Sequence, residues 1–185
     1  LPCGTQRALI AHASDMGSRG CGVDILPAGA RVAAVTICNG ADHYEIHIKC
    51  QEIPIHDPRA QIRLGLGATY KAAPAPARHT RASGEGEFRH PGLGEPPYDL
   101  DSFENRGGEQ KRIMSLTNAA TSAGFCLFGH ITIPVDATHE FISCVTGWDI
   151  DFDELILIGE RIANVQQAFN IREGLNPLEF HVPDR

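Results

Sequence analysis

The strongest hydrophobic pattern of the chain lies near its C-terminal end. Between Phe152 and Phe169, apolar residues fall on one broad stripe at helical spacing, while Glu160 and its charged neighbours lie on the opposite side. Asp151 is followed three residues later by Glu154, which is the pattern of a capping box with Asp in place of Ser or Thr. The pattern predicts an amphipathic helix over residues 151–169.

Two helices are expected upstream of this one, and a glycine ends each of them. Pro134 can start the nearer helix, and Gly147 stands where a helix commonly stops. The other is expected over residues 109–123 and is stopped by Gly124. The expected inner faces are Phe141, Ile142 and Val145 in the nearer helix, and Ile113, Met114, Leu116, Ala119, Ala120 and Ala123 in the other.

The first part of the chain mixes helical and strand-like patterns. Asp24 can cap a helix over residues 28–35, and the alternation of apolar and polar residues over 43–55 predicts a short strand. Residues 83–98 are rich in glycine and proline and are expected to form a loop or connector. We therefore predict a mainly α fold with two helical subdomains, residues 1–82 with the short strand and residues 99–185.

Composition argues against some classes of function but does not identify the function itself. The net charge is −7, without the clustered basic residues that nucleic-acid binding needs, and no run reaches the roughly 18 apolar residues of a membrane span. Six cysteines lie at wide, irregular spacings without a Cys-x-x-Cys pair, which favours buried reduced thiols and a cytoplasmic setting. The chain opens at Leu1, so we expect either processing or a piece of a longer protein.

Two groups of histidines are candidates for chemistry. His43 and His47 flank Glu45, but a zinc protease needs a different spacing on a helix, so polar positions on a strand are the expected role. His79 stands between Arg78 and Arg81, and nearby cations should lower its pKa and keep the imidazole neutral. An exposed loop histidine is the alternative interpretation of His79.

Cys126 is the third candidate. It follows Gly124 and Phe125, where the helix over residues 109–123 is expected to end. A thiolate at this point could bind a metal or cluster, and the glycine would let the backbone approach a cofactor closely. One cysteine supplies one ligand only, and a buried inert thiol is the alternative.

Three segments carry strings that are specific enough for comparison with known families. The first covers residues 24–59 and includes Glu-Ile-Pro-Ile-His-Asp-Pro-Arg, and the second covers residues 65–79. The third covers residues 146–185 and includes Gly-Glu-Arg-Ile and Phe-Asn-Ile-Arg-Glu-Gly. In this order and spacing, they resemble the C-terminal helical domains of the aldehyde:ferredoxin oxidoreductase family over nearly the whole chain.

The resemblance implies an oxidoreductase. Members of this family oxidise aldehydes to carboxylic acids and pass two electrons to ferredoxin or to a partner redox subunit. Their metal is tungsten or molybdenum, held by two pterin dithiolenes, and a [4Fe–4S] cluster lies beside one pterin. A β-rich N-terminal domain supports the pterins, and two largely helical domains cover them.

The resemblance also implies roles for five residues. Cys126 matches the cysteine that is the fourth ligand of the cluster, and Gly124 and Phe125 match residues that approach the pterin. Thr121 stands where the family has an aspartate, so a neutral hydroxyl replaces a carboxylate that accepts stronger, charge-assisted hydrogen bonds. His79 matches a histidine near the metal that acts in proton transfer.

Other parts of the family pattern are not in this sequence. The Cys-x-x-Cys-x-x-x-Cys motif that supplies the remaining cluster ligands is absent, and so is the N-terminal pterin-binding domain. The resemblance therefore implies an N-terminal pterin-binding segment or subunit as a partner. The alternative is a truncated, non-catalytic relative that acts as a binding or scaffold subunit.

Overall fold

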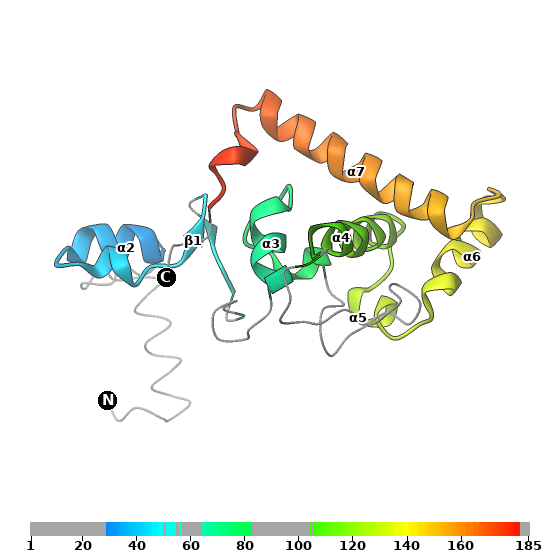
Figure 1. Cartoon of the computed structure of the whole chain (residues 1–185), viewed down its shortest axis with the longest axis horizontal. Coiled ribbons are helices and arrows are strands. Elements are labelled where there is room, and N and C mark those ends of the chain that lie inside the picture. Colours follow the sequence, from blue (N-terminus) through cyan, green and yellow to red (C-terminus); the bar gives the residue numbers. More distant parts are fainter. Residues whose placement is uncertain are drawn as a thin grey trace, which may run out of the picture.

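The computed structural model describes residues 29–49, 51–54, 56, 64–82, 104 and 106–181. Within these ranges the chain is mostly helical and carries one small two-stranded sheet, which confirms the predicted fold class (Figure 1). The α-helices are α2 (Ala30–Ile37), α3 (Leu64–Ala72), α4 (Arg106–Ser122), α5 (Leu127–His130), α6 (Val135–Thr146) and α7 (Phe152–Arg172). The short elements are the 3-10 helices η1 (Ala41–His43), η2 (His79–Ala82) and η4 (Pro177–Glu179) and the strands β1 (His47–Ile48) and β2 (Gln51–Glu52).

The region that was expected to form one strand is a tight hairpin. β1 and β2 pair antiparallel, with His47 opposite Glu52 and Ile48 opposite Gln51. Lys49 follows β1 with a φ of 50°, in the left-handed region that reverses the chain direction. The alternation of side chains predicted extended backbone, but it carries no signal for the reversal at Lys49.

Helix α2 overlaps the helix that was predicted over residues 28–35. It begins at Ala30, after Gly29, which has a φ of 91°. Asp24, the expected cap, lies outside the described residues. The turn after α2 leads into η1, so His43 lies in a 3-10 helix instead of the predicted strand.

The packing of α4 against α7 forms the centre of the fold (Figure 1). Every residue from 113 to 120 of α4 is buried, and Leu116 packs with Leu155 of α7. At Gly159 of α7, an added Cβ would lie 1.8 Å from the carbonyl oxygen of Ser115. The two backbones therefore approach so closely that only glycine fits at this position.

Helix α7 begins as predicted. The Asp151 carboxylate accepts a hydrogen bond of 2.8 Å from the Glu154 amide, which satisfies one of the free N–H groups of the first turn. The Glu154 carboxylate lies 2.8 Å from the Arg161 guanidinium. Gly147, in the left-handed conformation, ends α6 as expected.

The predicted inner face of α6 is wrong at two of its three positions. Phe141 is 55% exposed and Val145 is 85% exposed, whereas Val135 and Thr138 are buried and Ile142 packs against the core. The inward residues are spaced by three and four along the helix, so they form a stripe of their own. The apolar residues of α6 allow two stripes, and only the packing partner decides which of them is buried.

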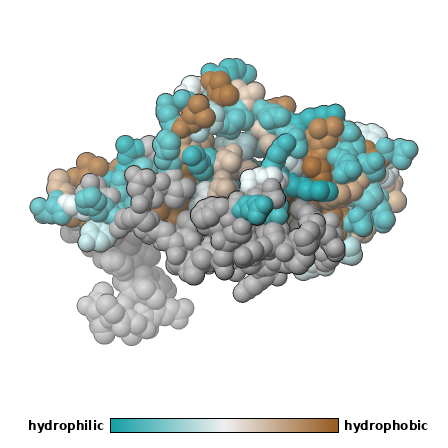
Figure 2. Space-filling view, in the orientation of Figure 1, coloured by the Kyte–Doolittle hydropathy of each residue, from teal (hydrophilic) through white to brown (hydrophobic). Residues whose placement is uncertain are grey.

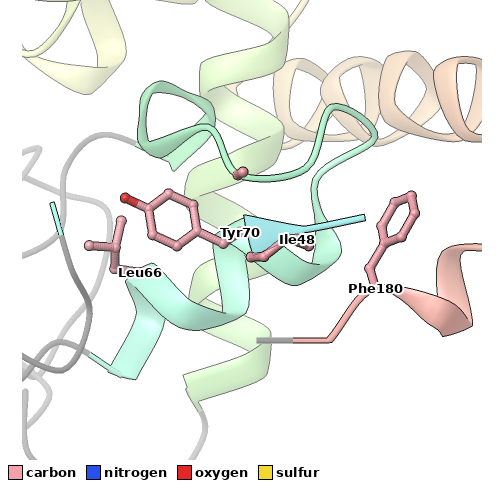
Figure 3. Packing of buried hydrophobic residues seen from close by; sticks show 5 residues of the cluster. Ile48, Leu66, Tyr70 and Phe180 are labelled. Atoms are coloured by element: carbon pink, nitrogen blue, oxygen red, sulfur yellow. The ribbon is translucent and has the colours of Figure 1, made fainter. Parts of the chain in front are cut away.

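The C-terminal segment returns to the start of the described chain. Phe180 is buried in a cluster with Ile48, Leu66, Tyr70 and Ala77, and Figure 3 shows how side chains from separate segments meet there. This contact ties the chain after α7 to the hairpin and to α3. Residues 83–98 lie outside the described residues, so the connector and the subdomain boundary stay predictions.

Several apolar side chains of the described chain are exposed. Val165 and Phe169 on α7 are 70% and 55% exposed, and Figure 2 shows hydrophobic patches over α2 and α7. Exposed apolar patches are typical of surfaces that contact other protein. In the described ranges, no helix combines the length and apolar character that crossing a membrane requires.

Candidate functional site

The structure brings together two of the elements that carry predicted site residues. η2, which begins at His79, packs against α4. The Arg81 guanidinium of η2 donates a hydrogen bond of 3.4 Å to the side-chain oxygen of Asn118, which is 1% exposed. Asn118 lies in the last part of α4, shortly before Thr121 and Cys126. η2, which carries His79, therefore contacts α4, and the other predicted residues lie at and after the end of α4.

His79 is partly buried and stacks on a second histidine. The ring centroids of His56 and His79 are 4.4 Å apart, and the planes are inclined by 46°. Burial lowers the pKa of His79 below its ordinary value, and the nearby His56 lowers it further. The predicted direction is confirmed, but the predicted cause is wrong, because the shift arises from burial and His56 rather than from the flanking arginines.

The segment that leads to His79 is held from two sides. The Tyr70 carbonyl accepts a hydrogen bond of 3.2 Å from the Ala77 amide, and Ala77 has a φ of 61°. The side-chain amide of Asn170, on α7, donates a hydrogen bond of 2.6 Å to the Pro74 carbonyl. Asn170 belongs to a family-specific string, but the sequence carried no sign that it holds this segment.

The end of α4 is open to the surroundings. Thr121 and Gly124 are exposed, and Phe125 is partly buried. Gly124 has a φ of 88°, and among the described residues nothing lies within 4 Å of the position that a Cβ would take. The glycine thus serves the turn and leaves free space beside the backbone, as the approach of a cofactor requires.

Cys126 lies at the start of α5 and is exposed. Hydrogen bonds from the backbone amides of Gly129 and Phe128 hold the pKa of the Cys126 thiol below its ordinary value. Thiolates are the form that binds metals, so this thiol suits a metal or cluster ligand. Within the described ranges, no group of three or more His, Cys, Asp or Glu residues could hold a metal ion. Further ligands would have to come from elsewhere.

Phe125 anchors the segment between α4 and α5. Its ring lies edge-on to His130 and to Phe141, with centroid separations of 6.2 Å in both cases. His130 is 2% exposed and Phe141 lies on α6. These contacts hold the turn that presents Cys126.

The structure also tests the expectations for the pair His43 and His47 and for the cysteines. His47 lies 3.2 Å from the Glu45 carboxylate, while His43 is exposed in η1, so the pair does not converge on a metal site. Cys38, Cys126 and Cys144 are free thiols, as expected, but they are exposed, so the prediction of buried thiols is wrong for these three.

A cavity of about 360 Å³ lies between α3, α4 and α7. Ala72, Met114, Asn118 and Asn164 are among the residues that line it. His79, Thr121 and Cys126 are not among its lining residues. The predicted site residues thus do not line this cavity.

Comparison with known proteins identifies a family for the chain. The family model "Aldehyde ferredoxin oxidoreductase, domains 2 & 3" matches residues 1–185. The tungsten-containing aldehyde ferredoxin oxidoreductases of Pyrococcus horikoshii and Pyrococcus abyssi are each 30% identical over 145 residues, which are 76% of this chain and 23% of the relative. The Pyrococcus furiosus enzyme is 29% identical over 142 residues, which are 75% of this chain and 22% of the relative. The chain therefore spans less than a quarter of the length of these relatives. It belongs to the aldehyde ferredoxin oxidoreductase family, within the region of domains 2 and 3.

Proposed function

We propose that the chain is the helical part of an enzyme that oxidises an aldehyde to a carboxylic acid. In this reaction, water supplies the added oxygen, and two protons and two electrons leave the substrate. The electrons pass to ferredoxin or to a redox subunit. Family membership and the names of the relatives support the reaction class.

The exposed thiol of Cys126 carries the proposal. Its lowered pKa favours the thiolate, and its place after the turn at Gly124 leaves the sulfur accessible. In this account Cys126 is one ligand of a [4Fe–4S] cluster. When bound, a tungsten or molybdenum bis-pterin centre would supply two-electron redox chemistry, and the cluster that Cys126 would help to hold would supply one-electron transfer.

The neighbouring residues fit contacts with a pterin. Free space beside Gly124 lets a planar ring approach the backbone, and Thr121 offers an exposed hydroxyl as a neutral acceptor for pterin N–H groups. Phe125 is held by two ring contacts and keeps the turn in place. The three residues are thus proposed to contact the pterin next to the cluster.

His79 is proposed to accept a proton during the oxidation. A water molecule that adds to the aldehyde carbonyl must lose a proton, and a neutral imidazole can accept it. The lowered pKa of His79 keeps the ring neutral near pH 7. Its helix contacts α4, which connects the proton acceptor to the helix that ends near Cys126.

The remaining cluster ligands and the pterin-binding domain are proposed to come from an N-terminal segment or subunit. The exposed apolar residues of α7 offer surface for such a contact. A cytoplasmic setting fits a cluster ligand that must stay reduced.

The test is analysis of the protein purified without air from its natural source, together with any copurifying partner. We expect about four iron atoms per assembly, as for one [4Fe–4S] cluster, with tungsten or molybdenum and aldehyde-dependent reduction of ferredoxin. A preparation without these metals and without aldehyde oxidation would overturn the proposal and favour the scaffold alternative.

A further inference from the structure

His56 lies against the histidine to which we assign proton transfer, although the two are far apart in sequence. The His56 ring stacks at a centroid distance of 4.4 Å on His79, and both side chains are partly buried. Two imidazoles at this distance cannot both become charged freely, because each positive charge disfavours the other. A positive charge on His56 therefore disfavours protonation of His79.

Tyr70 fixes both members of this pair. Its hydroxyl donates a hydrogen bond of 2.7 Å to the His56 carbonyl. Its own carbonyl accepts the Ala77 amide at 3.2 Å, just before the turn into η2. The Tyr70 side chain is fully buried in the cluster that includes Phe180, as Figure 3 shows. One rigid residue thus holds the segments on both sides of the stack.

Among the described residues around His79, His56 is the neighbour from another element that can carry a charge next to its ring. Arg78 and Arg81 lie on the same segment as His79, and Lys71 is exposed on α3, which packs against η2. The charged residues of α4 lie between residues 106 and 112, whereas the residue of α4 that forms a hydrogen bond with η2 is the neutral Asn118. The electrostatic neighbour that lowers the pKa of His79 is His56.

We propose that His56 is a positioning residue for His79, held against it by Tyr70. His56 keeps the His79 ring in a fixed orientation, and a positive charge on His56 disfavours protonation of His79. The assignment rests on the proposed role of His79 in proton transfer. It extends that role to a residue that lies in a family-specific string and to which no sequence pattern assigned a role of its own.

The proton titration of His79 in the full 185-residue chain tests the proposal directly. Ring-proton NMR of His56→Gln should show an upward shift of the pKa of His79, because the positive charge that His56 can carry no longer disfavours protonation of the neighbouring ring. His181 is exposed and serves as the internal control, whose titration should not change. An unchanged His79 titration in folded His56→Gln would overturn the proposal.

A second variant tests the proposal independently in case His56→Gln does not fold. Tyr70→Phe keeps the buried ring and removes only the hydroxyl that holds the His56 carbonyl. We expect this variant to lose ring-to-ring NOEs between His56 and His79 and to shift the His79 titration in the same direction. Retained NOEs and an unshifted titration in Tyr70→Phe would count equally against the proposal.

The pH profile of aldehyde oxidation separates this proposal from the proposed function. In the complete enzyme, His56→Gln should move the acidic limb of kcat towards higher pH, while His43→Gln, a change at an exposed histidine, should leave it in place. If His79→Gln retains full activity, the role of His79 is wrong, but the NMR result still decides whether His56 controls its titration.

Discussion

Helix α4 and the turn that follows it contain two stretches that differ sharply in their surroundings. Residues 113–120 are all buried, whereas residues 121–124 are exposed, and so is Cys126 beyond them. Both stretches contain small and hydroxyl-bearing residues, but the large apolar residues Ile113, Met114 and Leu116 lie only in the buried one. The chain thus belongs to the core from Ile113 to Ala120 and forms the edge of the candidate site from Thr121 onwards.

The buried part tolerates its hydroxyl groups because each of them bonds to the backbone of the same helix. The hydroxyls of Ser115 and Thr117 donate hydrogen bonds of 2.9 Å to the backbone carbonyls of Lys111 and Ile113. Such bonds remove the cost of burying a hydroxyl without a partner. Small side chains also let α7 approach closely at Gly159. In the described part of the chain, no helix packs on the exposed part to this extent, and Cys126 is exposed.

The largest effect is expected at the close approach of the two helices. Gly159→Val places side-chain atoms where the Ser115 carbonyl lies, so α4 and α7 must separate. We expect a loss of roughly 3 kcal/mol or more in the free energy of unfolding, measured by urea denaturation. Gly108→Ala is the control, because a Cβ there meets none of the described residues within 4 Å and should raise stability by about 0.5–1 kcal/mol. Equal stabilities of the two variants would show that the helices do not pack this closely.

An alanine substitution in the buried part of α4 and another in its exposed part compare the contributions of the two parts to stability. Leu116 is fully buried and packs against Leu155, so Leu116→Ala should cost about 2–5 kcal/mol of unfolding free energy. Ser122 is exposed at the end of the helix, and Ser122→Ala should change stability by less than about 0.5 kcal/mol. Urea midpoints of both variants check this, and a large cost at Ser122 would mean that the open end of α4 is covered.

The exposed thiols should differ in reactivity. Hydrogen bonds from the Gly129 and Phe128 amides favour the thiolate of Cys126. In the chain free of cofactors, iodoacetamide should therefore alkylate Cys126 roughly threefold or more faster than Cys144 near neutral pH. Mass spectrometry of the two peptides gives the rates. Faster alkylation of Cys144 would contradict the local structure given for the Cys126 turn.

The smallest expected effect is the pH dependence of stability through His79. Its pKa is lowered in the folded chain, by burial first and then by His56, so the unfolded chain binds a proton more readily. The contribution of His79 is complete above the unfolded value of about 6.5 and is lost as the pH falls through that value towards the folded pKa. His79→Gln should reduce the loss of stability between about pH 7.5 and about pH 5.5, whereas His43→Gln should not. Parallel pH profiles for His79→Gln and the unchanged chain would refute this linkage.

Sequence patterns predicted the elements whose signals are local. The Asp151 cap, the Gly147 stop and the position of the helix that became α4 depend on neighbouring residues, and the structure confirms them. The inner face of α6 could not be chosen, because its two apolar stripes differ only in what they meet in space. The hairpin at Lys49 was missed, because a residue with positive φ leaves no mark in the alternation.

The candidate site was predictable through residues that match a family motif, and much less through their surroundings. His79 and Cys126 could be singled out from the sequence, and their roles remain proposals. The contacts that hold them come from distant segments, such as His56 beside His79 and Asn170 on the Pro74 carbonyl. Long-range contacts of this kind leave no periodic trace, which explains why the source of the lowered His79 pKa was misassigned.

The most direct test of the account is the iron content of Cys126→Ser in the complete enzyme, purified without air beside Cys144→Ser. Both cysteines are exposed in the chain, but only Cys126 lies at the open end of α4, beside the free space at Gly124. The account predicts that Cys126→Ser loses iron from the [4Fe–4S] cluster or alters its EPR signal, while Cys144→Ser keeps the unchanged protein's iron content and signal. Full iron and an unaltered signal in a folded Cys126→Ser enzyme would contradict the assignment of this edge as the cluster-facing site.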